Sequence, residues 1–190
     1  MSKQKYSPLM IVALAATSFV QPEARAADGP SDPQIVGIVL AADQIDVNYG
    51  NIALAKSKDK KVRDFAQRMV TDHSAVQQSV IGLAAKLGVT AEDSPTSEGL
   101  QGGARDVTAK LNSLQGKAFD KFYIDNEVSY HKTVTDAVDA VLIPSARNSE
   151  LKSALEGARP LFLQHLAHAR SIQAGGDGKM SHSKMDHPKK

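Results

Sequence analysis

Five ionisable side chains lie on the apolar faces of the helices that the sequence predicts. His73 follows Met69 by four residues and precedes Val76 by three, so it shares a helical face with these apolar residues. Equivalent spacings place four more residues on apolar faces, namely Asp46, Glu127, His131 and His165. Because an isolated buried charge costs several kcal/mol, such groups must pair, become neutral or bind a metal ion.

All five residues lie near the middle of their predicted helices, so helices packed side by side would bring them to one layer. Three imidazoles and two carboxylates are donor types of transition-metal sites, and Zn, Cu and Fe are the candidate ions. Asp72 and Asp125 lie just beside the apolar faces. We expect these two carboxylates to accept the second ring proton of a metal-binding histidine, and Asp72 is the expected partner of His73.

The same layer has a second interpretation that needs no metal. A single histidine in a core is more commonly a hydrogen-bonded structural residue than a ligand. His165 and His131 could hydrogen-bond Glu127 and Asp46, and this polar network would fix the register of the helices. The contribution of one ionisable residue or pair from every helix is what favours the metal site.

Four long helices are predicted to position these residues. Their expected spans are 32–57, 59–87, 117–142 and 148–173, and a shorter helix is expected over 105–114. Residues 88–104 form a polar connection rich in Gly, Ser and Pro, and Pro160 is expected to kink or divide the last helix. No strand pattern is present. The predicted fold class is therefore all-α, an up-down four-helix bundle with an extra short helix between helices two and three.

Residues 1–26 have the features of a secretory signal peptide. Lys3 and Lys5 precede an apolar run over 9–20, and the small-residue pattern Ala-Arg-Ala at 24–26 follows it. No later segment has the ~18 uninterrupted apolar residues of a membrane-spanning helix. We therefore predict a periplasmic protein with a linker at 27–31, a helical bundle at 32–173 and a tail at 174–190.

The tail contains Met, His and Lys without apolar periodicity, which predicts disorder. Two Met-x-His pairs occur in it, formed by Met180, His182, Met185 and His187. A thioether beside an imidazole suits copper, so these residues are weak candidates for a copper site, with chance composition as the alternative.

Composition argues against several function classes. The predicted leader holds three of the 23 basic and one of the 21 acidic residues, so the mature chain has no net formal charge, and nucleic acid is not expected as a partner. The absence of cysteine removes that nucleophile and any disulfide. No phosphate-binding loop or nucleophile elbow is present, and no catalytic residue is assigned.

Three segments, "VRDFAQRMVTDHS", "FDKFYIDNEVSYH" and "LFLQHLAHA", resemble the bacterial family known as domain of unknown function 4142. The resemblance extends over about 32–173. It implies a ferritin-like helical fold, export, and a peripheral contact with the envelope, since members are commonly labelled outer-membrane proteins. Ferritin-like relatives hold two metal ions with carboxylates from two helices and a Glu-x-x-His motif from each of the other two.

The sequence departs from that di-metal pattern. No glutamate stands three residues before His73, Glu127 precedes His131 by four residues, and Phe162 stands three residues before His165. A di-iron oxidase centre is therefore disfavoured, and a histidine-rich mononuclear site or a metal-free layer fits better.

Three functions follow, in order of preference. The first is an exported metal-binding bundle in envelope or stress homeostasis, and the second is a non-enzymatic structural or interaction protein of the envelope with a metal-free polar core. The third is a metal-dependent oxidase or peroxide-detoxifying enzyme. The sequence leans against an enzyme and does not indicate an oligomeric state.

Overall fold

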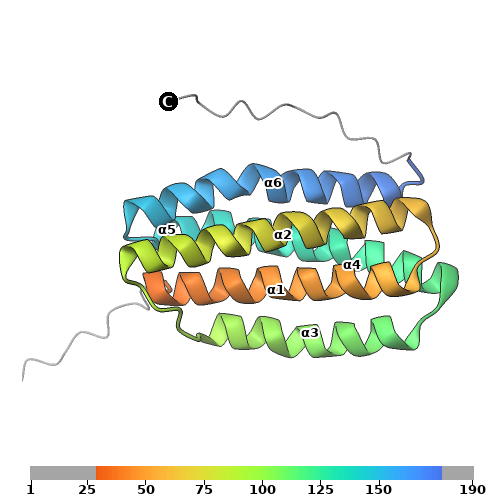
Figure 1. The fold of residues 1–190 in the computed structure, drawn as a ribbon, viewed down its shortest axis with the longest axis horizontal. Helices are drawn as coiled ribbons and strands as arrows, with labels where there is room; N and C mark the ends of the chain where they lie inside the picture. Colours follow the sequence, from red (N-terminus) through yellow and green to blue (C-terminus); the bar gives the residue numbers. More distant parts are fainter. Residues whose placement is uncertain (1–28, 177–190) are drawn as a thin grey trace, which may run out of the picture.

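The computed structural model describes residues 29–176, which form helices and their connections without any strand (Figure 1). The predicted leader and the tail candidates Met180, His182, Met185 and His187 lie outside the described residues. The long helices are α1 (Asp32–Lys56), α2 (Lys60–Leu87), α3 (Pro95–Ser113), α4 (Gly116–Ala137) and α6 (Ser149–Gln173). A π-helical segment, η1 (Val138–Leu142), and the single turn α5 (Ile143–Ser145) connect α4 to α6.

Side-chain caps explain where several helices begin. Ser31 accepts a hydrogen bond from the backbone of Gln34, and the Gln34 side chain accepts one from the backbone of Ser31. Asp59 and Asn148 cap α2 and α6 by accepting bonds from backbone N–H groups of the first turn. Gly88 ends α2 in the left-handed conformation with φ 65°. These ends lie within two residues of the predicted ones.

The third helix is longer than the sequence analysis expected. Residues 95–104 were expected to belong to a polar connection, but α3 already begins at Pro95. Ser94 accepts from the backbone of Ser97, Ser97 accepts in return from the backbone of Ser94, and Pro95 occupies the first turn. The prediction of a short helix is therefore wrong, because this capping pattern overrides the glycine-rich composition.

Pro160 does not divide the last helix, since α6 is one continuous helix from Ser149 to Gln173, and the alternative of a kink at Pro160 stays a prediction. Pro160 removes the donor to the carbonyl of Glu156, but both residues are exposed, so water can bond that carbonyl. The π-helical segment was not predicted. It precedes Pro144, which has no N–H for an α-helical bond, and Ile143 donates instead to the carbonyl of Val138.

The chain runs back and forth along the long axis, and each long helix reverses the direction of the one before it (Figure 1). Helix α3 packs on the outside of α1. Because the chain crosses the length of the molecule once in α3, between α2 and α4, the helices α2 and α4 run in the same direction. The four helices α1, α2, α4 and α6 therefore form two antiparallel pairs, not a simple up-down series.

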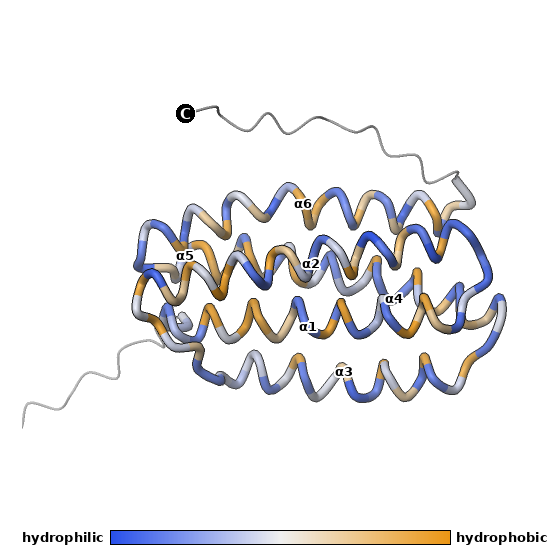
Figure 2. The backbone as a smooth tube through the Cα atoms, in the orientation of Figure 1, coloured by the Kyte–Doolittle hydropathy of each residue, from blue (hydrophilic) through white to orange (hydrophobic). Residues whose placement is uncertain are grey.

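Two apolar clusters fill the interior between these four helices, one toward each end of the molecule. Phe65, Phe119 and Tyr123 belong to the first cluster, and Ile35 and Phe162 belong to the second. Figure 2 shows apolar positions recurring along every long helix. Helix α1 contacts α2, α3 and α4, so its apolar residues are not confined to one face. No helix in residues 29–176 is long and apolar enough to cross a membrane.

Candidate metal centre

A single layer of ionisable residues lies between the two apolar clusters, and each of the four core helices contributes to it. We call the following residues the polar layer: Asp43 and Asp46 from α1, Asp72 and His73 from α2, Glu127 and His131 from α4, and His165 from α6. All of them are buried except Asp72, which is partly exposed. The helices thus bring the five predicted site residues together.

Three donor atoms approach one another as closely as the ligands of one metal ion. His73 Nε2 lies 3.3 Å from His131 Nε2, and Asp46 Oδ2 lies 3.0 Å from the first and 3.3 Å from the second. In a tetrahedral site with bonds of about 2.0–2.1 Å, neighbouring ligand atoms are about 3.3 Å apart. The three atoms therefore outline one face of such a tetrahedron.

The second nitrogen of each imidazole contacts an oxygen acceptor. His73 Nδ1 lies 2.7 Å from a carboxylate oxygen of Asp43, and His165 Nε2 lies 2.9 Å from one of Asp72. His131 Nδ1 lies 3.1 Å from the backbone carbonyl of Glu127. Such acceptors fix the tautomer and the ring orientation of metal-binding histidines.

These contacts leave three nitrogens without a proton when the rings are neutral. They are Nε2 of His73, Nε2 of His131 and Nδ1 of His165. Two of these lone pairs face each other and the carboxylate of Asp46, which is a repulsive arrangement unless a cation lies between them. That cation is either a metal ion or a proton on His73.

Several buried polar atoms of the layer have no hydrogen-bond partner among the described residues. They are Oδ2 of Asp43, both carboxylate oxygens of Asp46, both of Glu127, and Nδ1 of His165. Asp46 Oδ2 lies 3.0 Å from His73 Nε2, so a proton on that nitrogen would pair with it. Donor atoms of two overlapping groups lie within 4.8 Å of one another: His73, His131 and His165, and Asp46, Glu127 and His131. Unpartnered polar atoms at such a density are uncommon in a protein core, and they fit a metal ion.

Without a metal ion, a proton on His73 supplies the positive charge that offsets the negative charge of Asp46. Burial alone lowers the pKa of His73, but the charge of Asp46 and the hydrogen bond with Asp43 raise it to about 10. Burial raises the pKa of Asp46, yet the charges of His73 and His131 lower it to about 2. The metal-free protein thus holds an imidazolium between carboxyl groups.

Three further groups of the layer, namely Glu127, His131 and His165, are neutral when no metal is bound. Asp72 stays a carboxylate, because its hydrogen bond with His165 lowers its pKa. Burial and the charge of Asp46 raise the pKa of Glu127 well above its usual range, so this carboxyl keeps its proton. Burial lowers the pKa of His131, and it lowers the pKa of His165 to about 4. A metal ion would therefore displace protons from His73 and Glu127.

Two of the predicted orienting carboxylates lie differently from their expected places. Asp72 contacts His165 on the facing helix instead of the adjacent His73. Asp125 is not part of the layer, because its carboxylate accepts hydrogen bonds from Lys121 and Gln173 near the surface. Sequence offset alone does not tell which side chains meet across a helix interface.

Asp43, which holds His73, was missed by the sequence analysis. It precedes Asp46 by three residues on α1, and residues at this spacing share a helical face. That spacing was the signal that could have identified it. Its buried carboxylate gives His73 the acceptor that had been assigned to Asp72.

Apolar side chains occupy the positions where a second metal ion would need carboxylates. Phe162 stacks on the His73 ring with centroids 5.6 Å apart and planes 7° apart. Val70 stands three residues before His73, at the other of these positions. The polar layer thus contains enough donor atoms for one metal ion, and the residues at these positions provide no carboxylate for a second ion.

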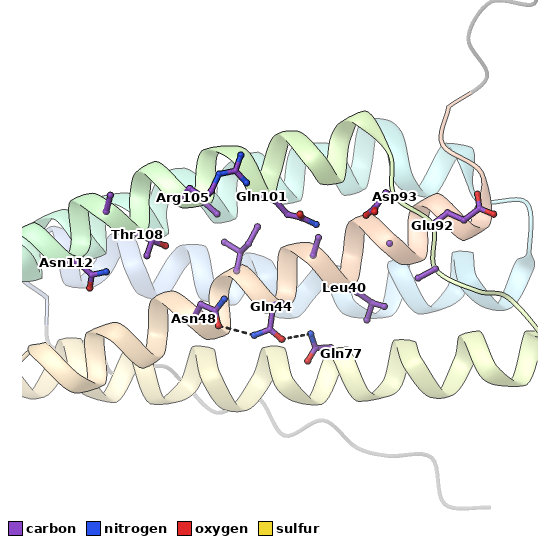
Figure 3. Close-up of a pocket in the computed structure, with 16 residues that line it drawn as sticks. Leu40, Gln44, Asn48, Gln77, Glu92, Asp93, Gln101, Arg105, Thr108 and Asn112 are labelled. Atoms are coloured by element: carbon purple, nitrogen blue, oxygen red, sulfur yellow. Dashed lines mark hydrogen bonds between the residues drawn. The ribbon is translucent and has the colours of Figure 1, made fainter.

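A surface groove beside α1 does not reach the polar layer. It has a volume of about 810 Å³ and lies between α1 and α3 (Figure 3). Gln44 of α1 donates a hydrogen bond to Asn48 and accepts one from Gln77 of α2 (Figure 3). Arg105 and Thr108 of α3 also line the groove. No residue of the polar layer lines this groove.

The comparisons with known proteins address the family and leave the activity open. No curated protein and no solved structure gives a significant match to the chain. A family described as "Domain of unknown function (DUF4142)" matches residues 17–172, which covers all five long helices almost to the end of α6 and also the last part of the predicted leader. The match includes every residue of the polar layer, and the chain belongs to this family of domains of unknown function.

Proposed function

We propose that this protein binds one transition-metal ion in the polar layer, with His73, His131, His165 and Asp46 as ligands. Glu127 supplies a further carboxylate beside them. The observation that carries the proposal is the approach of His73 Nε2, His131 Nε2 and Asp46 Oδ2 to within 3.0–3.3 Å of one another, with all three side chains buried. The oxygen acceptors behind all three imidazoles support it.

The donor set favours a borderline ion such as Zn, Cu or Fe. A metal ion bound here would supply a positive charge that neutralises Asp46 and Glu127. The ligand side chains of the site are 0–4% exposed, and four to five donors saturate a tetrahedral or five-coordinate ion. Closed sites of this kind hold or store an ion, whereas catalytic sites keep a position open. Metal binding is therefore preferred to an oxidase or peroxide-detoxifying activity.

The helix order supports a ferritin-like bundle as the finer fold assignment. Ferritin-like folds contain two antiparallel helix pairs joined by one long crossover, and α3 occupies that crossover between the α1–α2 pair and the α4–α6 pair. Phe162 beside the layer argues for a mononuclear derivative of that site.

We further propose that the protein works in the periplasm, in envelope or stress homeostasis. The support is the predicted leader with cleavage after Ala26. Cell fractionation and the mass of the mature protein test the location: the protein is expected in the periplasmic fraction without residues 1–26. An uncleaved cytoplasmic chain would contradict it. A salt wash of the membrane fraction tests for peripheral envelope contact.

The direct test of the metal site is elemental analysis after purification without chelator. The wild type is expected to contain close to one equivalent of a transition metal, and the double variant His73→Ala, His165→Ala almost none. His168→Gln is the matched control, since it removes an imidazole from the same helix but outside the layer. Equal, near-zero metal in all three proteins, together with no shift of Tm on adding Zn, Cu or Fe, would favour the structural, metal-free interpretation.

A further inference from the structure

We infer that the metal ion enters the polar layer through the face between α2 and α6, where Asp72 is its first ligand and Arg68 competes with it. This inference rests on the proposed metal binding and concerns how the buried site is loaded.

Asp72 is the point at which the polar layer meets solvent. Its side chain is 24% exposed, whereas those of the other layer residues are 0–4% exposed. A hydrated cation can therefore meet a carboxylate of the layer at Asp72 before it loses its water. The buried carboxylates of Asp43, Asp46 and Glu127 are accessible only to an ion that is already largely dehydrated.

His165 connects this exposed carboxylate to the interior. Its Nε2 lies 2.9 Å from Asp72 Oδ2, while its Nδ1 is buried without a partner. The ring lies 5.1 Å from that of His73 and 5.2 Å from that of His131, measured between centroids. One side chain thus separates an ion at Asp72 from the other ligands.

The other approaches to the layer are closed. The apolar clusters cover it toward both ends of the molecule. The groove between α1 and α3 contains no layer residue, and neither does the depression near Asp59 and Gln173. On the α1 side, the carboxylate nearest to His73 belongs to Asp43 and is only 3% exposed.

Arg68 forms an ion pair with Asp72 at the proposed entrance. Its Nε lies 3.2 Å from Asp72 Oδ2, the same oxygen that His165 approaches, and its side chain is 29% exposed. The guanidinium neutralises Asp72 and repels an incoming cation. An ion must displace this partner before the carboxylate can bind it, so Arg68 is expected to slow both entry and exit.

The experiment follows the visible absorption of Co²⁺ in stopped-flow mixing with the metal-free, full-length mature protein at constant pH. Asp72→Asn is expected to lower the association rate constant by about tenfold or more, and Asp72→Glu to restore most of it. Arg68→Gln is expected to raise it severalfold and to accelerate release into excess chelator. The matched control is Asp64→Asn, which removes a 61% exposed carboxylate from the same helix, outside the layer.

The association and dissociation rate constants distinguish a role of Asp72 in metal entry from a role in orienting His165. If Asp72 only orients the ring, Asp72→Asn accelerates dissociation and leaves the association rate constant within about twofold of the wild type, and this overturns the inference but not the proposed function. An unchanged rate in Arg68→Gln also counts against it. A wild type that binds no Co²⁺ overturns the proposed function and the inference together. Circular dichroism confirms that each variant is folded.

Discussion

Glu127 is the residue that best distinguishes a metal-binding polar layer from a metal-free one. Its carboxyl is fully buried, both oxygens lack a hydrogen-bond partner among the described residues, and burial keeps its pKa well above the usual range. A metal-free protein therefore contains the neutral acid, whereas a metal ion needs the carboxylate. The two interpretations therefore assign different charges to this side chain, zero without a metal ion and −1 with one.

We predict that Glu127→Gln leaves the Tm of the metal-free protein almost unchanged, because glutamine imitates the protonated acid. The Kd for the metal is expected to rise by at least about tenfold, because the amide cannot supply a negative ligand. Thermal unfolding in chelator and isothermal titration calorimetry measure the two quantities. Glu156→Gln on the exposed side of α6 is the control. A large drop of Tm in chelator with unchanged affinity would instead assign Glu127 to a structural network.

At the same scale, periodicity located the five buried site residues because a 3.6-residue repeat fixes which side chains face the core. It did not give their partners. Asp72 turned out to contact His165, and Asp43 rather than Asp72 holds His73, because those contacts depend on the rotation and approach of two helices. Asp125 shows the same limit, since its true partners are Lys121 and Gln173.

At the scale of the elements, the pairing of α1 with α2 brings Asp43 and Asp46 to His73, and Gly50 permits that approach. A Cβ at Gly50 would lie 2.8 Å from Val70 Cγ2 and 3.0 Å from the backbone oxygen of Ala66. Both distances are shorter than ordinary van der Waals contacts. The glycine thus sets the separation of the two helices one turn from the polar layer.

We predict that Gly50→Ala lowers the free energy of unfolding by about 1–3 kcal/mol, because α1 and α2 must separate to admit the methyl group. The same movement is expected to weaken metal binding. Gly82→Ala is the control: nothing lies within 4 Å of its added Cβ, so it is expected to stabilise α2 by about 0.5–1 kcal/mol. Urea unfolding measures both. Equal effects of the two substitutions would show that helix propensity, not the approach of α1 to α2, decides the outcome.

Element types and most element ends followed from caps and periodicity, but α3 did not. Its sequence contains Gly99, Gly102 and Gly103, a composition typical of a connection. The structure keeps it helical because the Ser94–Ser97 capping box starts it, and Leu111 is fully buried near its other end. Packing on α1 thus outweighs the low helix propensity of this segment, and tertiary packing of this kind cannot be judged from the local sequence.

At the scale of the whole molecule, the polar layer makes stability depend on pH in two directions when no metal is bound. His73 has a folded-state pKa of about 10, above the value of 6.5 for the unfolded chain, so its contribution is complete below pH 6.5 and is lost as pH rises toward 10. His165 has a folded-state pKa of about 4, so its contribution is lost as pH falls from 6.5 toward 4. These two histidines by themselves place the highest stability of the metal-free protein near pH 6.5, and the raised pKa of Glu127 adds to the loss of stability as pH rises.

We predict that the free energy of unfolding in chelator decreases between pH 7 and pH 9, and that this decrease is smaller in His73→Gln. The decrease that remains in the variant comes from Glu127, because its buried carboxyl keeps a proton that the unfolded chain releases. A saturating metal ion removes the decrease in the wild type, because His73 and Glu127 have already lost their protons when the metal is bound. On the acid side, the metal steepens the decline, since protons compete with it for three imidazoles. Urea unfolding at fixed ionic strength, with chelator and with Zn²⁺, measures all three curves. If the free energy of unfolding of the metal-free protein stayed constant from pH 7 to pH 9, His73 would carry no proton in the folded state. The lone pairs of His73 and His131 would then repel each other and the carboxylate of Asp46, and another cation would have to lie between them.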